Sequence, residues 1–366
     1  MMPQRKHFID NLRWMAILLL FPFHAAQIWN GGEYSGFYIW SHTDNIMYAF
    51  STFTYPWFMA LLFAIAGMSC KYSLQKRTGG QFFIERVKKL LIPFIFGVLF
   101  LAPIMTFIAE KFFNGYTGTY LEQYILFFTK ETDLTGYKGG FTPAHFWFLL
   151  YLFVISAASL PVILAQKKRR PDFQLNKLPY MGLILLFIPQ WLMLYVFNIA
   201  GKSIGQFSAL FLIGYYILSQ ENILQKLKQY RFISLLLWLT SGCLYTYLYC
   251  FKNMRNELGA GLFVFFGWTG ILFFLGIGQT AFNFQGKIST YFSKASFPIY
   301  IVHQAVLVVI GFFVLKFPIG TWEQFFIIVF ASFAVTLLLY EMIRRIPYFR
   351  ALFGIFAHKL PAERKK

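Results

Sequence analysis

Two ionisable residues stand inside the first long apolar segment of the chain, where an unpaired charge is costly to bury. Arg13 and His24 are eleven residues apart, about three helical turns, so both lie on one face and about 16 Å apart along the helix. Asp10 lies on the same side, three residues before Arg13. This polar stripe suits an active site or a pore. Alternatively, Arg13 extends to the segment's end and His24 pairs with a neighbouring helix.

Two further groups carry candidate chemistry. His303 lies about 10 Å into a late apolar segment, so it can share a depth with His24, although a hydrogen bond to a neighbouring helix also explains it. Arg86 and Lys89 are three residues apart, which predicts one helical face. Such a pair suits phosphate groups, although a basic cluster can also simply mark one side of a membrane.

Composition identifies the elements that must position these residues. The chain has 366 residues, of which 58% are hydrophobic and 13% are charged. Soluble domains are usually about 45–50% apolar and about 25% charged. A soluble globule of this length cannot cover so much apolar surface. The composition therefore excludes an ordinary soluble enzyme, a disordered chain and a fibrous one, and it indicates a polytopic membrane protein.

We expect an all-α polytopic bundle of about ten transmembrane helices, because a span needs about 20 apolar residues. One domain covers residues 1–343, and a basic cytoplasmic tail covers residues 344–366. The ten expected spans are residues 12–30, 46–70, 91–109, 145–165, 180–198, 204–219, 232–250, 259–282, 296–315 and 323–343.

Charge predicts the orientation of the bundle. Of the 33 Lys and Arg residues, 25 fall in the termini and alternate connections on one side, and seven fall on the other side. The positive-inside rule therefore places both termini in the cytoplasm. It also explains the net charge of +19 without a nucleic-acid partner. The longest polar stretch, 110–144, is then an outer loop rich in Gly and aromatic residues that contacts a polar substrate such as a sugar, or is a solvated connector.

Several other chemistries lack their motifs. There is no GxxxxGK[ST] loop, which argues against ATP-driven transport, and no HExxH or GxSxG sequence. Cys70, Cys243 and Cys250 are an odd, scattered set that forms no disulfide framework and no zinc site. The apolar segments contain too few converging His, Asp or Glu residues to ligate a metal, so we expect none. His145 begins the fourth expected span, which places it at the outer interface beside Trp147.

Four segments, in this order, together resemble the acyltransferase-3 family of membrane enzymes. Arg13-x10-His24 resembles the family's opening signature, FFIERVKKLLIP (82–93) its basic motif, HFWFL (145–149) its HxWFL segment, and SFPIYIVH (296–303) its late S-x-x-IY-x-x-H segment. The sequences PFH (22–24), YE (340–341) and RIP (345–347) are similar to the branch that succinylates periplasmic glucans. The chain departs from the family pattern at Lys89, which replaces an Arg and loses its bidentate fork.

The resemblance implies ten spans and transfer of an acyl group from cytoplasmic acyl-CoA, as co-substrate, to a hydroxyl of an extracytoplasmic glycan or lipid-linked sugar. The membrane would be the bacterial inner membrane. His24 would act as the general base, and Asp10 would hold Arg13. Arg13, Arg86 and Lys89 would bind the CoA phosphates. His303, with Tyr300 beside it, would orient donor or acceptor.

A transporter or flippase for an anionic or sugar-containing substrate is the alternative, because polar stripes and a basic inner mouth also suit anion passage. The chain shows no inverted repeat and no matched pair of broken helices. Acetyl, succinyl and longer acyl groups all stay open, as do the acceptor, the oligomeric state and any separate extracytoplasmic partner.

Overall fold

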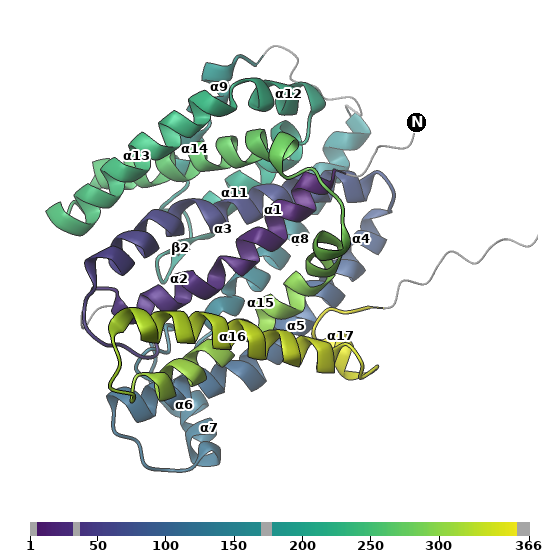
Figure 1. Cartoon of the computed structure of the whole chain (residues 1–366). Helices are drawn as coiled ribbons and strands as arrows, with labels where there is room; N and C mark the ends of the chain where they lie inside the picture. The colour runs from purple at the N-terminus through teal and green to yellow at the C-terminus, as the bar shows by residue number, and fades with distance from the viewer. Residues whose placement is uncertain (1–5, 32–36, 170–177, 357–366) are drawn as a thin grey trace, which may run out of the picture.

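The fold is a bundle of helices, as the sequence predicts (Figure 1). The structure is a computed structural model that describes residues 6–31, 37–169 and 178–356. Within these residues the only sheet is a hairpin of two short antiparallel strands, β1 (Asn198–Ile199) and β2 (Lys202–Ser203). The all-α class is therefore confirmed.

Eight helical segments in the described part of the chain are long and apolar enough to cross a membrane. They agree with eight of the ten expected spans. They are α1–α2–η1 (His7–Trp29), α3 (Asn45–Leu74), α4–α6 (Gly79–Phe113), η5–α8 (Ala144–Arg169), α13 (Arg231–Lys252), α14 (Glu257–Ala281), α15 (Lys287–Val314) and α16 (Thr321–Ile343).

Of the other two expected spans, the first ends at residue 192 rather than 198, and the second ends at 218, one residue earlier than predicted. Helices α9 (Tyr180–Leu185) and α10 (Phe187–Leu192) form one apolar segment, and α11 (Ile204–Ile213) with η6 (Gly214–Leu218) forms the other. At about 1.5 Å per residue they are roughly 20 and 22 Å long, less than the roughly 30 Å of a bilayer core. The β1–β2 hairpin joins them. Such short helices are tolerated where neighbouring protein, rather than lipid, covers the backbone at their ends.

The span Gly79–Phe113 changes its helical pitch twice. Helices α4 (Gly79–Arg86), α5 (Ile92–Phe96) and α6 (Ala102–Phe113) alternate with two π-helical segments, η3 (Val87–Leu91) and η4 (Gly97–Leu101). Each π segment ends two residues before a proline, Pro93 or Pro103. Proline has no N–H to complete the regular ladder and its ring crowds the preceding turn, so the turn widens.

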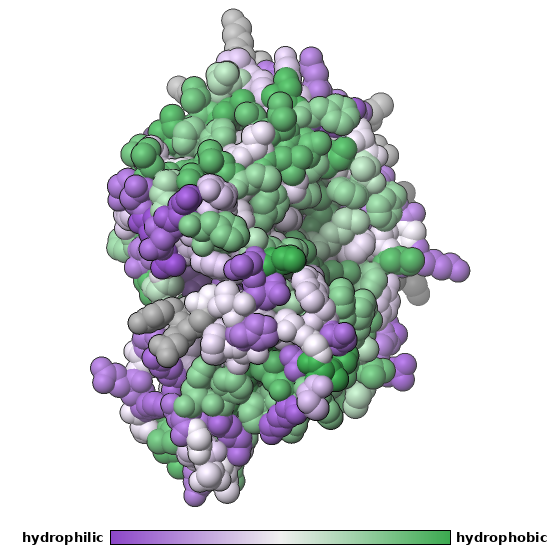
Figure 2. Space-filling view, turned by 60° about the vertical axis from the view of Figure 1, so that its left-hand side comes forward, coloured by the Kyte–Doolittle hydropathy of each residue, from purple (hydrophilic) through white to green (hydrophobic). Residues whose placement is uncertain are grey.

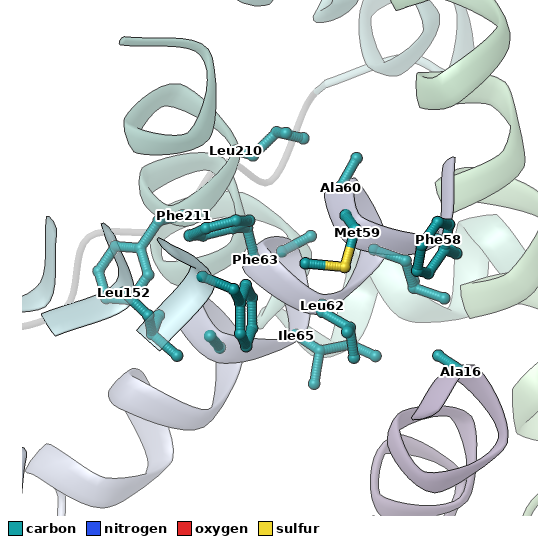
Figure 3. Close-up of a cluster of buried hydrophobic side chains, with 14 of the residues drawn as sticks. Ala16, Phe58, Met59, Ala60, Leu62, Phe63, Ile65, Leu152, Leu210 and Phe211 are labelled. Carbon is teal, nitrogen blue, oxygen red and sulfur yellow. The ribbon is translucent and has the colours of Figure 1, made fainter. Parts of the chain in front are cut away.

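Helix α3 runs through the centre of the bundle. Figure 3 shows side chains of α3, among them Leu62 and Phe63, beside Leu152 of α8 and Phe211 of α11. Two glycines allow the close approach of α3 to α11 and η6. A Cβ on Gly67 would lie 1.9 Å from the carbonyl oxygen of Phe211, and one on Gly214 would lie 2.2 Å from that of Ala64. Small residues at such crossings let helix backbones approach closely.

We predict that Gly214→Val destabilises the protein by about 3 kcal/mol or more, because backbone atoms rather than flexible side chains occupy the space. Thermal unfolding of the purified protein in detergent tests this, with Gly80→Val as the control because a Cβ on Gly80 meets nothing within 4 Å. An unfolding temperature of Gly214→Val equal to that of the control would contradict the close crossing.

Large apolar side chains cover much of the surface, as a bilayer requires. Figure 2 shows hydrophobic residues over much of one face, with hydrophilic residues in separate groups. Leu236 of α13 and Phe330 and Leu338 of α16 are each more than 60% exposed. Soluble monomers rarely expose continuous apolar patches of more than a few hundred Å². The surface therefore agrees with an integral membrane protein.

The first and last long helices of the bundle begin and end, respectively, on the same side of the molecule. In Figure 1, α1 begins and α16 ends on the right-hand side of the molecule. After α16 the chain turns back into α17 (Phe349–Leu352), where the ring centroids of Phe349 and Phe353 lie 5.9 and 5.1 Å from that of Phe96 in α5. The first part of the expected tail, to residue 356, thus packs on the bundle. The tail from residue 357 onward lies outside the described residues.

Candidate active site

Three histidines from distant parts of the sequence meet inside the bundle. His24 lies in α2 (Leu20–Ala26), His145 in η5 (Ala144–Phe146) and His303 in the middle of α15. The ring centroid of His303 lies 5.3 Å from that of His24 and 4.9 Å from that of His145. The prediction that His24 and His303 share a depth is confirmed.

His145 begins its span, as the sequence predicts, but its side chain is buried in the bundle. The span begins at Ala144, and only 8% of the surface of His145 is exposed. Ala144, with φ of 47°, turns the chain inward just before the α8 helix. The imidazole of His145 then faces the backbone of α15, and its own carbonyl accepts a hydrogen bond from the hydroxyl of Tyr300. The HFWFL motif (145–149) drew attention to this segment, but the sequence did not predict that His145 would contact α15.

Backbone carbonyls fix which ring nitrogen carries hydrogen on two of these histidines. Nδ1 of His303 lies 2.7 Å from the carbonyl oxygen of Tyr300, and Nε2 of His145 lies 3.2 Å from that of Ile301. Since a carbonyl oxygen only accepts, each of these nitrogens donates. The lone pair of His303 is therefore on Nε2.

Three histidine nitrogens are buried without a hydrogen-bond partner among the described residues. They are Nδ1 of His24, Nδ1 of His145 and Nε2 of His303. Burying a polar atom unpaired costs about 1–3 kcal/mol, so unpaired buried atoms that lie close together need an explanation. Atoms of a reacting substrate are the partners that such a cluster can take.

A large cavity begins at the histidines. Its volume is about 920 Å³, within the range of small-molecule sites. His24, His145, Tyr300 and Gln304 are among its lining residues, and His303 is fully buried beside His24 and His145. Much of the remaining lining is aromatic, with Phe23, Phe37, Tyr38, Tyr48, Tyr55, Tyr137, Phe141, Trp147, Tyr151, Tyr245, Tyr249 and Phe263.

The outer loop 110–144 forms one wall of this cavity. Its residues from Leu134 to Ala144 contribute to the lining, after the short helix α7 (Tyr120–Thr129). The buried carboxylate of Glu110 pairs with Lys130. Gly139, at φ of +87°, fits beside it because a Cβ there would lie 1.8 Å from the Glu110 carboxylate. The loop is thus an ordered part of the cavity rather than a solvated connector.

Tyrosine hydroxyls outside the spans supply neutral hydrogen-bonding groups to the cavity. Burial raises the pKa of Tyr38 and of Tyr137 well above the ordinary value for tyrosine. Both side chains therefore stay protonated at physiological pH. The Tyr38 hydroxyl donates to the carbonyl oxygen of Thr135 at 3.4 Å. Both hydroxyl oxygens can accept hydrogen bonds, which suits a ligand rich in hydroxyl groups.

A basic cluster lies at the other end of the first span. Arg13 donates to Asp10 at 3.1 Å, the expected pair, and to the hydroxyl of Ser69 at 2.8 Å. The guanidinium of Arg86 lies 4.5 Å from the ring centroid of Phe82, and its Nε is buried without a hydrogen-bond partner. Arg13 is among the charged neighbours of Arg86. Two guanidinium groups thus lie near each other.

Arg86 and Lys89 differ in burial, although both are charged neighbours of Glu85. Arg86 is partly buried, whereas Lys89 is exposed and donates to Glu85 at 2.6 Å. Glu85 also pairs with Arg77 at 3.1 Å. The π-helical segment η3 begins at Val87 and widens the turn between the two residues.

The structure therefore places the predicted site residues in two groups. His24 and Tyr300 line the cavity with His303 beside them, whereas Asp10, Arg13, Arg86 and Lys89 lie outside its lining. The histidine group can move protons, and the group with Arg13 and Arg86 can bind anions. No group of three His, Cys, Asp or Glu side chains in residues 6–31, 37–169 and 178–356 is placed to hold a metal ion.

This fold and site define an integral membrane transferase. The chain belongs to the acyltransferase-3 family, because that family's model, described as an acyltransferase domain, matches residues 6–341. The protein is therefore a membrane acyltransferase. Similar proteins include the glucans biosynthesis protein C of Salmonella agona (strain SL483) and that of Salmonella paratyphi A (strain ATCC 9150 / SARB42). Each is 23% identical over 96% of this chain and 94% of the relative. No solved structure matches the chain significantly.

Proposed function

We propose that this enzyme transfers an acetyl or succinyl group from cytoplasmic acyl-CoA to a hydroxyl of an extracytoplasmic glycan or lipid-linked sugar. The proposal places it in the bacterial inner membrane with both termini in the cytoplasm. One observation carries it: His24, with an unpaired buried nitrogen, lines a cavity at one end of the first span, while Arg13 lies at the other end. The name of the similar proteins, glucans biosynthesis protein C, supports a glycan acceptor.

His24 acts as the general base in this proposal. It takes the proton of the acceptor hydroxyl while the hydroxyl oxygen attacks the thioester carbonyl. The new C–O bond forms, the C–S bond breaks, and the proton passes on to the CoA thiolate. His303 and Tyr300 orient the reacting groups. Both are held in place themselves: His303 donates to the Tyr300 carbonyl, and the Tyr300 hydroxyl donates to the His145 carbonyl.

The inner cluster binds the phosphates of CoA. The planar guanidinium groups of Arg13 and Arg86 suit bidentate contact with phosphate oxygens. Asp10 holds Arg13 in place, and Lys89 adds a point charge at the exposed rim. Since Arg13 and His24 are about 16 Å apart along the helix, the long pantetheine arm carries the thioester from one group to the other.

The cavity provides for a sugar acceptor. Tyrosine and tryptophan combine a flat apolar ring with a polar edge. A sugar ring has the matching pattern, with C–H groups on its faces and hydroxyls around its rim. The aromatic lining and the tyrosine hydroxyls therefore support a sugar more than a purely apolar ligand.

Acyl transfer by the purified protein tests the proposal. We expect release of free CoA from acetyl-CoA or succinyl-CoA by the protein in nanodiscs, and we expect this release to require a glucose oligosaccharide as acceptor. Mass spectrometry of the acceptor should show the added acyl mass. The control omits the acceptor, which separates transfer from hydrolysis. A folded protein that binds neither donor but carries labelled oligosaccharide across a vesicle membrane would favour a transporter instead.

A further inference from the structure

The cavity lining carries two basic side chains, and no carboxylate among its described lining residues. Lys202 and Arg255 are these cations. Lys202 belongs to the β1–β2 hairpin, and Arg255 belongs to the connection between α13 and α14. A cavity whose only fixed charges are positive attracts an anion.

Lys202 is held in a partly buried position without a counter-ion. Its ammonium lies 5.5 Å from the ring centroid of Trp147 and donates to the carbonyl of Ala200 at 3.2 Å. Burial lowers the pKa of Lys202. No ion pair joins it to a carboxylate in the described residues. An ammonium that has lost water without gaining a counter-ion is stabilised by an anion placed beside it.

Arg255 also forms no ion pair with a carboxylate among the described residues, although its side chain hydrogen-bonds Tyr48. Its guanidinium lies 5.2 Å from the ring centroid of Tyr249, at the exposed mouth of the cavity. The carboxylate of Glu257, two residues further along the chain, accepts a hydrogen bond from Tyr195 at 2.7 Å and forms no ion pair with Arg255. A guanidinium stacked on an aromatic ring still presents its donors to a phosphate or carboxylate.

The position of Lys202 and Arg255 indicates whether the bound anion belongs to the acyl donor or to the acceptor. Lys202 and Arg255 are two of the seven basic residues on the side expected to be outside, opposite Arg13 and Arg86. If the thioester arrives from the Arg13 end, as the proposed function has it, a group bound at Lys202 and Arg255 belongs to the acceptor. We propose that these two residues bind a phosphate or carboxylate carried by the sugar acceptor, so that the substrate class is an anionic glycan or a sugar phosphate.

Binding measured without donor tests this inference separately from catalysis. The probes are a neutral glucose trisaccharide and the same trisaccharide with one phosphate monoester, titrated by calorimetry into the protein in nanodiscs. We expect the phosphorylated form to bind about tenfold more tightly. We also expect the preference to shrink as salt rises. The double variant Lys202→Gln/Arg255→Gln should lose this preference, and Lys202→Arg, which keeps the charge, should retain it.

Lys252→Gln is the matched control. Lys252 is also an exposed outer cation over an aromatic ring, that of Tyr247 at 5.8 Å, but it does not line the cavity. It should keep the preference although it removes the same charge. Equal binding of the two trisaccharides to the wild-type protein would overturn the inference, and so would a preference that survives in the double variant.

Two outcomes separate this inference from the function on which it rests. Selective binding of the phosphorylated trisaccharide without any acyl transfer would contradict the proposed function and leave the anion site intact. A double variant that changes the ratio of succinyl-CoA to acetyl-CoA use, but not the preference among acceptors, would assign the cations to the acyl group. That result would overturn the inference.

Discussion

Replacing His24 with asparagine should lower the rate of acyl transfer by about two to four orders of magnitude, the usual contribution of a general base. Asparagine keeps a polar side chain of similar size but cannot accept a proton at neutral pH. CoA release at saturating donor and acceptor measures the effect. The affinity for acyl-CoA should stay close to that of the wild type, because the proposed phosphate ligands lie at the other end of the span.

His42→Asn is the matched control for this substitution. His42 is exposed, lies outside the cavity lining, and contacts the hydroxyls of Ser41 and Thr321, each at 3.1 Å. We expect this variant to transfer acyl groups at the wild-type rate. Size-exclusion chromatography and circular dichroism should show that both variants are folded. If folded His24→Asn kept more than about a tenth of the rate, His24 would not be the base.

Replacing Arg86 with alanine should weaken acyl-CoA binding by about ten- to a hundredfold, because hydrogen bonds between charged groups contribute about 1.5–3 kcal/mol. Arg86 is the strongest candidate in the inner cluster, since its Nε is buried without a hydrogen-bond partner. Arg86→Lys should recover part of the loss, because lysine keeps the charge but lacks the bidentate fork. Titration of acyl-CoA into the protein in nanodiscs measures both effects.

Lys88→Ala controls for the general positive field of this region. Lys88 is exposed and lies two residues from Arg86. Its substitution by alanine removes the same charge as Arg86→Ala. We expect a small effect from it, and an intermediate one from Lys89→Ala, because Lys89 is exposed and already pairs with Glu85. Equal losses from Arg86→Ala and Lys88→Ala would mean that the charge of the membrane face, rather than a built site, attracts the donor.

The sequence by itself determined the class of fold and the approximate spans. Hydrophobicity summed over about 20 residues is a local property, so it needs no knowledge of neighbouring helices. The Asp10–Arg13 pair was predictable for the same reason, since residues three apart on a helix are always neighbours. His24 and His303 were correctly matched in depth from their distances along two helices.

Only the tertiary structure decided which side chains converge. The position of His145 beside His303 depends on how η5 packs against α15, about 155 residues further along the chain. The π-helical turn between Arg86 and Lys89 is a second such feature. A third is the cavity, part of whose lining comes from loop 110–144. These features follow from contacts between residues distant in sequence, such as the crossing at Gly67 and Gly214. A property summed over a short window of sequence cannot predict such contacts.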